Sequence, residues 1–188
     1  MSRKNKKKFF RKWSRIDQSK SPVVRSQPVN FSGKYVGLDL GAFCGIAVKD
    51  GLSIIADTWD LNSKKRIHGS GMKFLLFKSM LKDVLSTGPI SSIFYEEVRR
   101  HKGVSAAHAY GGYESHLLAF CEENNIPFLS IPVGTVKAFA TGKGNASKDM
   151  MILAARKKWP SIEIGPKEDD KADALWILFT GLNELGLE

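Results

Sequence analysis

The sequence has few cysteines, no long apolar run and, near its start, almost no acidic residues. Cys44 and Cys121 are the only cysteines among 188 residues, so a disulfide framework is excluded and both are expected to be reduced, buried residues of an intracellular protein. No run of 18 apolar residues occurs, which predicts no membrane span. The basic start is not followed by an apolar segment, so no secretory signal is expected. The four histidines have no metal-ligand spacing.

The positive charge is concentrated at the start of the chain. The formal charge is +10, and residues 1–34 hold 11 of the 29 Lys and Arg with Asp17 as their one acid. We therefore expect residues 1–33 to be a disordered basic arm and residues 34–188 to be one folded domain. Such arms commonly neutralise nucleic-acid phosphates, although a solubilising role is an alternative. The arm residues expected to meet phosphates are Arg3, Lys4, Lys6, Lys7, Lys8, Arg11 and Lys12.

Hydrophobic spacing predicts an α/β domain. The expected strands are 35–41, 44–50, 52–61, 91–98 and 126–133, and the expected helices are 71–86, 104–124, 134–141, 147–159 and 169–185. Three strands in a meander, followed by helix–strand units, give a five-stranded mixed sheet with helices on both faces. This order favours a ribonuclease-H-like fold over a Rossmann fold, in which strands and helices alternate from the start.

Acidic residues occur where the pattern predicts buried strands. Asp39 lies within GLDLG, where a carboxylate is costly unless a charged partner compensates it, and Gly37 and Gly41 leave room for a close backbone approach. A structural Asp that caps a turn or pairs with a lysine is the alternative. Glu96 and Glu97 end a later strand and point to opposite faces, so at most one of them shares a site with Asp39.

The last predicted helix begins with further acids. Asp170 and Asp173 are three residues apart and share one helix face, whereas Asp169 is predicted to be the N-cap. Carboxylates from these separate segments would repel one another unless a cation lay between them. Oxygen ligands without His or Cys favour Mg²⁺ or Mn²⁺, and two such ions can assist phosphodiester cleavage. The predicted metal ligands are Asp39, Glu96, Asp170 and Asp173.

A second group of residues lies in VKAFATGKGNASKDMM (136–151). Lys137 precedes a turn containing Gly142 and Gly144, and Lys148 enters the next helix. Glycine-rich turns that lead into a helix N-terminus suit phosphate binding, and the lysines would contact the phosphates. Taken alone, the segment also fits a solvent-exposed loop with incidental lysines.

With these blocks in the order found here, the chain resembles the RuvC-type Holliday junction resolvases. YVGLDLGAFCGIAV, YEEV, the VKxxxxGxGxAxK pattern of 136–148 and DxxDALxI of 170–177 resemble four motifs of that family, over roughly residues 34–185. The resemblance places Asp39, Glu96 rather than Glu97, Asp170 and Asp173 on its metal ligands, and Lys137 and Lys148 on its basic catalytic residues. Leu40 stands where the family usually has proline. Arg99 stands where it often has an aromatic residue thought to probe junction bases.

The resemblance implies a Mg²⁺-dependent endonuclease, with two ions per site and Mn²⁺ as a substitute. It would act as a homodimer that resolves four-way DNA by paired symmetric nicks, which leave 5′-phosphate and 3′-hydroxyl ends. The helix 104–124, with Tyr110 and Tyr113, is the expected dimer contact, and ordinary packing is the alternative for the tyrosines. The residues expected to bind DNA outside the arm are Arg99, Arg100, His101, Lys102, Lys143 and Lys148.

Three other functions compete with this one. A broader nuclease that debranches flaps, forks and replicating phage DNA needs the same acids. A non-catalytic junction-binding protein would tolerate their loss. A nucleotide-binding protein of the actin and sugar-kinase type shares GxDxG but needs two related domains, for which the chain is too short. The expected location is the cytoplasm of a bacterial or phage-infected cell, with an organelle left open.

Overall fold

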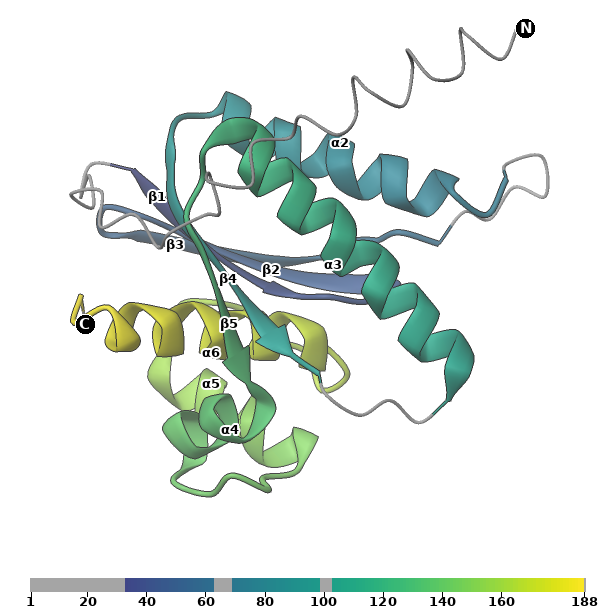
Figure 1. Cartoon of the computed structure of the whole chain (residues 1–188). Helices are drawn as coiled ribbons and strands as arrows, with labels where there is room; N and C mark the ends of the chain where they lie inside the picture. The colour runs from purple at the N-terminus through teal and green to yellow at the C-terminus, as the bar shows by residue number, and fades with distance from the viewer. Residues whose placement is uncertain (1–32, 63–68, 99–102, 188) are drawn as a thin grey trace, which may run out of the picture.

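The computed structural model describes residues 33–62, 69–98 and 103–187, which form a five-stranded mixed sheet with helices on both faces (Figure 1). The strands lie in the order β3-β2-β1-β4-β5, and the ribonuclease-H-like arrangement expected from the sequence is confirmed. The strands are β1 (Lys34–Asp39), β2 (Phe43–Asp50), β3 (Ser53–Asp60), β4 (Ile90–Glu97) and β5 (Phe128–Pro132). The helices are α2 (Met72–Ser86), α3 (Val104–Asn124), α4 (Val133–Thr141), α5 (Lys148–Lys158) and α6 (Asp169–Glu184).

The first three strands form the expected antiparallel meander. The turn between β2 and β3 contains Gly51 with a φ of +56°, a conformation that glycine adopts without steric cost. The strand β1 then pairs in parallel with β4, and β4 pairs in parallel with β5. Because Leu38 is paired with Tyr95, the carboxyl ends of β1 and β4 lie next to each other in the sheet. The last residues of these two strands therefore come together at one end of the sheet.

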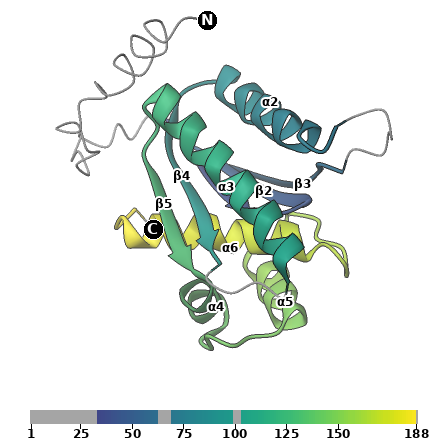
Figure 2. The same cartoon turned by 45° about the vertical axis from the view of Figure 1, so that its right-hand side comes forward.

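The two faces of the sheet carry separate hydrophobic clusters. The helices α2 and α3 cover one face, and α6 covers the other with α4 and α5 packed against it (Figures 1 and 2). Alternation along β1 sends Val36 and Leu38 to the α2–α3 face and Tyr35 to the α6 face. Both cysteines are buried in the cluster under α2 and α3, as expected. No helix within the described residues is long and apolar enough to cross a membrane.

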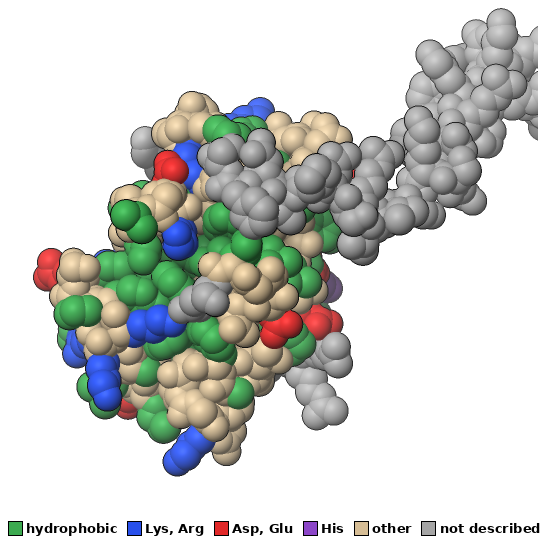
Figure 3. Space-filling view, turned by 90° about the vertical axis from the view of Figure 1, so that its left-hand side faces the viewer, with side chains coloured by type: hydrophobic (Ala, Val, Ile, Leu, Met, Phe, Trp, Pro, Cys, Tyr) green, Lys and Arg blue, Asp and Glu red, His purple; other side chains and the backbone are tan. Residues whose placement is uncertain are grey.

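The start of β1 lies at the opposite end of the sheet from Asp39. There the buried Lys34 ammonium donates hydrogen bonds to the carbonyl oxygens of Val84 (3.2 Å) and Gly88 (3.4 Å), which ties β1 to the end of α2. A mainly apolar hollow of about 500 Å³ opens beside it, with Ile55 and Trp59 in its wall. Hydrophobic side chains gather on the face of the molecule seen from this side (Figure 3).

Glycines allow α6 to lie unusually close to the sheet. A Cβ at Gly37 would lie 2.5 Å from the Ala174 carbonyl oxygen, and one at Gly45 would overlap the Asp170 carbonyl oxygen. The close approach expected at Gly37 is therefore made by the backbone of α6. At Gly41 a Cβ would meet only Phe43, within the turn that joins β1 to β2, so no other element approaches the backbone there. In β2, Gly45 lies opposite Asp39 and also allows the close approach of α6.

Replacing Gly45 with alanine is expected to destabilise the fold. The added methyl group would push α6 away from β2, and overpacking of this kind costs about 1–3 kcal/mol. Chemical denaturation should therefore show a lower free energy of unfolding for Gly45→Ala. Gly111→Ala is the matched control, because a Cβ at that position in α3 has open space around it. Equal stability of Gly45→Ala and the wild type would contradict the close packing of α6.

Candidate active site

Asp39 ends β1 on the face that α6 covers. Alternation along the strand puts it on the same side as Tyr35 and Gly37, which both face α6. Burial is the main cause of a pKa that lies well above the ordinary value of 3.8, and the negative charges of Asp173, Glu96 and Asp170 raise it further. Lys148 acts in the opposite direction. Four acidic side chains from three elements therefore lie within electrostatic reach of one another.

Glu96, and not Glu97, shares this face. Phe94 packs in the cluster under α6 whereas Tyr95 packs under α3, so alternation along β4 points Glu96 toward α6 and Glu97 away from it. The pKa of Glu96 is raised to about 7, first by burial and then by Asp173, whereas Lys137 lowers it. Hydrophobic periodicity does not show which of the two glutamates faces α6. The packing of Phe94 and Tyr95 in different clusters shows that it is Glu96.

The first two turns of α6 supply Asp170 and Asp173. The pKa of Asp173 is raised to about 6 by burial, and the nearby Lys148 and Lys137 lower it. The pKa of Asp170 is also raised, by burial and then by Asp169. The helix begins at the end of the sheet where β1 and β4 end, which brings these acids to Asp39 and Glu96.

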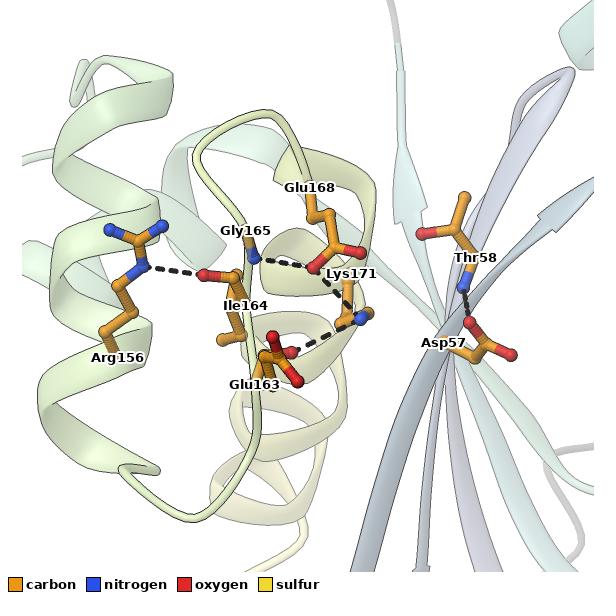
Figure 4. Close-up of polar contacts among 8 residues, drawn as sticks. All are labelled: Asp57, Thr58, Arg156, Glu163, Ile164, Gly165, Glu168 and Lys171. Carbon is orange, nitrogen blue, oxygen red and sulfur yellow. Dashed lines mark hydrogen bonds and ion pairs between the residues drawn. The ribbon is translucent and has the colours of Figure 1, made fainter.

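The N-cap prediction for Asp169 is wrong. Glu168 occupies the N-cap position, and its carboxylate accepts a hydrogen bond from the Gly165 backbone N–H (2.6 Å) and pairs with Lys171 (3.0 Å), as Figure 4 shows. Asp169 is instead the first helical residue, where an acid is favoured by the helix dipole, and its carboxylate forms an ion pair with Lys148. Local sequence does not distinguish the two residues, because both are acids at neighbouring positions.

Two lysines lie beside the carboxylates. Lys137 lies in α4, and its charge lowers the pKa of both Glu96 and Asp173. Lys148 is the first residue of α5, and its charge acts on Asp39, Asp170 and Asp173. Lys143 is exposed in the turn between these helices, after Gly142, which has a φ of +76°. The structure therefore brings Lys137 and Lys148 to the acids and leaves Lys143 in the solvent-exposed turn.

The donor set suits a hard divalent cation. Four carboxylates whose pKa values are raised by burial and by neighbouring acids have an excess of negative charge that such an ion would neutralise, and oxygen ligands match Mg²⁺. Within residues 33–62, 69–98 and 103–187, no three acidic, His or Cys side chains form a ready-made metal cage. Mg²⁺ usually keeps several waters and completes its coordination with substrate phosphates, so it does not require three preformed protein ligands.

Tyr110 and Tyr113 do not lie where a partner could touch them. Their exposed fractions are 8% and 1%, and both pack in the cluster under α2 and α3. The Tyr110 hydroxyl donates a hydrogen bond to the Glu96 carbonyl oxygen (2.7 Å), so this tyrosine ties α3 to the end of β4. The prediction that they are dimer contacts is therefore wrong, and their role is ordinary packing.

Several residues expected to bind DNA lie outside the described part of the chain. These are Arg99, Arg100, His101 and Lys102, together with the arm residues Arg3, Lys4, Lys6, Lys7, Lys8, Arg11 and Lys12.

Curated proteins with detectable sequence similarity to the chain are crossover junction endodeoxyribonucleases. No family model matches the chain. The crossover junction endodeoxyribonuclease RuvC of Carboxydothermus hydrogenoformans is 28% identical over 157 residues, which are 81% of this chain and 98% of that protein. RuvC of Synechococcus sp. (strain WH7803) is 38% identical over 56 residues, which are 30% of this chain and 36% of that protein.

Solved structures share the fold. RuvC of T. thermophilus in complex with a Holliday junction substrate superposes with a TM-score of 0.67 at 20% sequence identity, over 82% of this chain and 97% of that one. The yeast mitochondrial Holliday junction resolvase Ydc2 gives a TM-score of 0.56 at 19% identity, over 86% of this chain and 82% of that one.

The carboxylates make the stability of the metal-free protein depend on pH. A raised pKa means that the folded state holds a proton more tightly than the unfolded state, so the free energy of unfolding should fall as the pH rises from about 4.5 to about 7, the range set by the pKa of Glu96. Asp173 adds to the same fall between its ordinary pKa of 3.8 and about 6. Urea denaturation at a series of pH values, with the chelator EDTA present, measures this slope.

Asp173→Asn should flatten the slope, because the amide cannot ionise, whereas Glu184→Gln at the far end of α6 should leave it unchanged. Added Mg²⁺ should restore stability most at high pH, where the carboxylates are ionised. A slope that is equally steep in Asp173→Asn would show that the site acids do not cause it.

Proposed function

From the premise that this chain is a distant relative of the RuvC-type Holliday junction resolvases, we propose that it is a Mg²⁺-dependent endonuclease that cuts four-way DNA junctions. The observation that carries the proposal is the convergence of Asp39, Glu96 and Asp173 from three elements, where burial raises all three pKa values and the Asp173 charge raises those of Asp39 and Glu96 further. A purely structural cluster would not need acids at the edge of a hydrophobic core, where burial makes each charge costly.

The proposed reaction is hydrolysis of one phosphodiester per active site. Asp39, Glu96, Asp170 and Asp173 would hold two Mg²⁺ ions. When bound, the ions would supply an activated water and stabilise the leaving 3′ oxygen, so that the products carry a 5′ phosphate and a 3′ hydroxyl. Lys137 and Lys148 would balance the negative charge that develops on the phosphate. The ammonium groups suit this role because both already lie within electrostatic reach of the acids.

Paired symmetric nicks require two active sites, so the proposed working form is a homodimer on a two-fold symmetric junction. Lys143, exposed in the turn between α4 and α5, would contact the DNA backbone together with Lys148. The segment 99–102 and the arm of residues 1–33 would add further phosphate contacts. The proposed location is the cytoplasm of a bacterial or phage-infected cell, with an organelle as the alternative.

Cleavage of branched DNA is expected to depend on Glu96 and not on Glu97. Glu96→Gln and Asp39→Asn should abolish Mg²⁺-dependent cleavage of a four-way junction while leaving binding intact, because each removes a proposed metal ligand without changing the shape of the side chain. Glu97→Gln is the matched control, since it changes the adjacent glutamate on the opposite face. The assay is gel separation of labelled junction strands, with a flap and a plain duplex run in parallel.

Normal cleavage by Asp39→Asn would exclude the proposed metal site. A wild type that binds the junction but does not cut it would instead leave a non-catalytic junction-binding role. Faster cleavage of the flap than of the junction would favour the broader debranching activity.

Deletion of residues 1–30 is expected to weaken DNA binding and to reduce its salt dependence. A chain without the arm would neutralise fewer phosphates and so release fewer counterions on binding, which makes the slope of log K against log salt concentration shallower. Fluorescence anisotropy with a labelled junction, in Ca²⁺ to prevent cleavage, measures this slope. A deletion variant with the slope of the full chain would show that the arm does not contact DNA.

A further inference from the structure

The N-termini of two helices are joined by one ion pair at the active site. Lys148 begins α5, Asp169 begins α6, and the Lys148 ammonium pairs with the Asp169 carboxylate. The two residues are 21 positions apart, so this contact depends on how the helices pack. It is the contact through which the proposed catalytic lysine is attached to the helix that carries Asp170 and Asp173.

Asp169 is not the N-cap residue of α6, so capping does not account for an acid at this position. The side chain of Glu168 accepts the hydrogen bond from Gly165, so the loop before α6 is held without Asp169 (Figure 4). The Lys148 side chain is 73% exposed, whereas that of Asp169 is 21% exposed. A long, mostly solvated lysine is thus held at its tip by a carboxylate that is itself largely enclosed.

We propose that Asp169 is a positioning residue, which holds the Lys148 ammonium at the edge of the carboxylate site so that an incoming DNA phosphate meets it already oriented. The proposal rests on the proposed nuclease function and assigns a role to a fifth acid, which is not among the proposed metal ligands. Support comes from the geometry of the ion pair, which joins the first residue of α5 to the first residue of α6.

The physical reason is the flexibility of lysine. Fixing a lysine side chain costs up to about 2 kcal/mol of rotamer entropy, and a group that is held in place before the substrate arrives avoids part of this cost during the reaction. An ammonium group has three donors, so the bond to Asp169 leaves two for a phosphate. The ion pair itself is at the surface and should add little to folding stability.

A double-mutant cycle tests the role. Asp169→Asn keeps the shape but removes the charge, and it should slow single-turnover cleavage of a four-way junction about fivefold, the effect of roughly 1 kcal/mol. In a Lys148→Met background the same change should have no further effect, because Asp169 acts only through the lysine. Asp169→Glu, which keeps the carboxylate, should recover most of the rate.

Asp149→Asn is the charge-matched control. Asp149 is exposed and adjacent to Lys148, so its replacement removes one negative charge next to the lysine, from the first turn of α5, and leaves the ion pair with Asp169 in place. This variant should cleave at the wild-type rate. Unfolding temperatures of all variants should agree closely, since only a surface ion pair is altered.

A measurement without cleavage follows the lysine itself. In the protein without metal or DNA, NMR of the Lys148 side-chain ammonium should show a resonance protected from exchange in the wild type and in Asp149→Asn. The protection should be lost in Asp169→Asn.

Three results would overturn the proposal. The first is a wild-type cleavage rate in Asp169→Asn. The second is a fall in cleavage rate on adding Asp169→Asn to Lys148→Met that equals its fall in the wild type. The third is a Lys148 ammonium resonance in the wild type that is not protected from exchange. A wild type that cuts no branched DNA would instead show that the proposed function is wrong, and the positioning role would fail with it.

Discussion

The close contact between α6 and the first two strands determines most of the site. Gly37 and Gly45 have no side chains on that face, so the helix backbone at Ala174 and Asp170 lies directly on the sheet. The buried run from Leu175 to Leu182 then fixes the helix along its length. Asp170 and Asp173 are consequently placed at the ends of β1 and β4, although their charges repel Asp39 and Glu96.

The acids are therefore held together by apolar packing and not by attraction between them. Burial and mutual repulsion raise their pKa values, and Lys137 and Lys148 offset only part of this cost. Functional sites often show such strain, which a substrate or a cation relieves. A divalent cation among the carboxylates would convert repulsion into attraction, and its binding would then add to the stability of the fold.

Much of the fold could be predicted from the sequence because its local signals agree. The Asp50–Gly51 turn, the alternating strands and the helix Val104–Asn124 all follow from spacing and turn chemistry. The face of Glu96 could not be derived from periodicity, because β4 is apolar on both faces and packs against helices on each. The resemblance to known motifs selected it, and the positions of Phe94 and Tyr95 give the physical reason.

Other features depend on tertiary contacts that leave no local trace. Glu168 and Asp169 are adjacent acids, and only the path of the preceding loop decides which of them takes the N-cap position. The sequence around Gly45 does not show that this residue lies against the backbone of α6. Tyr110 and Tyr113 lie on the face of α3 that turns inward, and the weak amphipathic pattern of that helix did not show which face this was.

The central claim is that the ends of β1 and β4 and the start of α6 form a divalent cation site. Crystals soaked in Mn²⁺ and measured for anomalous scattering test it most directly, since Mn²⁺ substitutes for Mg²⁺ at oxygen sites. We expect an anomalous peak within coordination distance of Asp39 and of at least one of Glu96, Asp170 and Asp173. Ordered carboxylates with no peak among them at saturating Mn²⁺ would contradict the account.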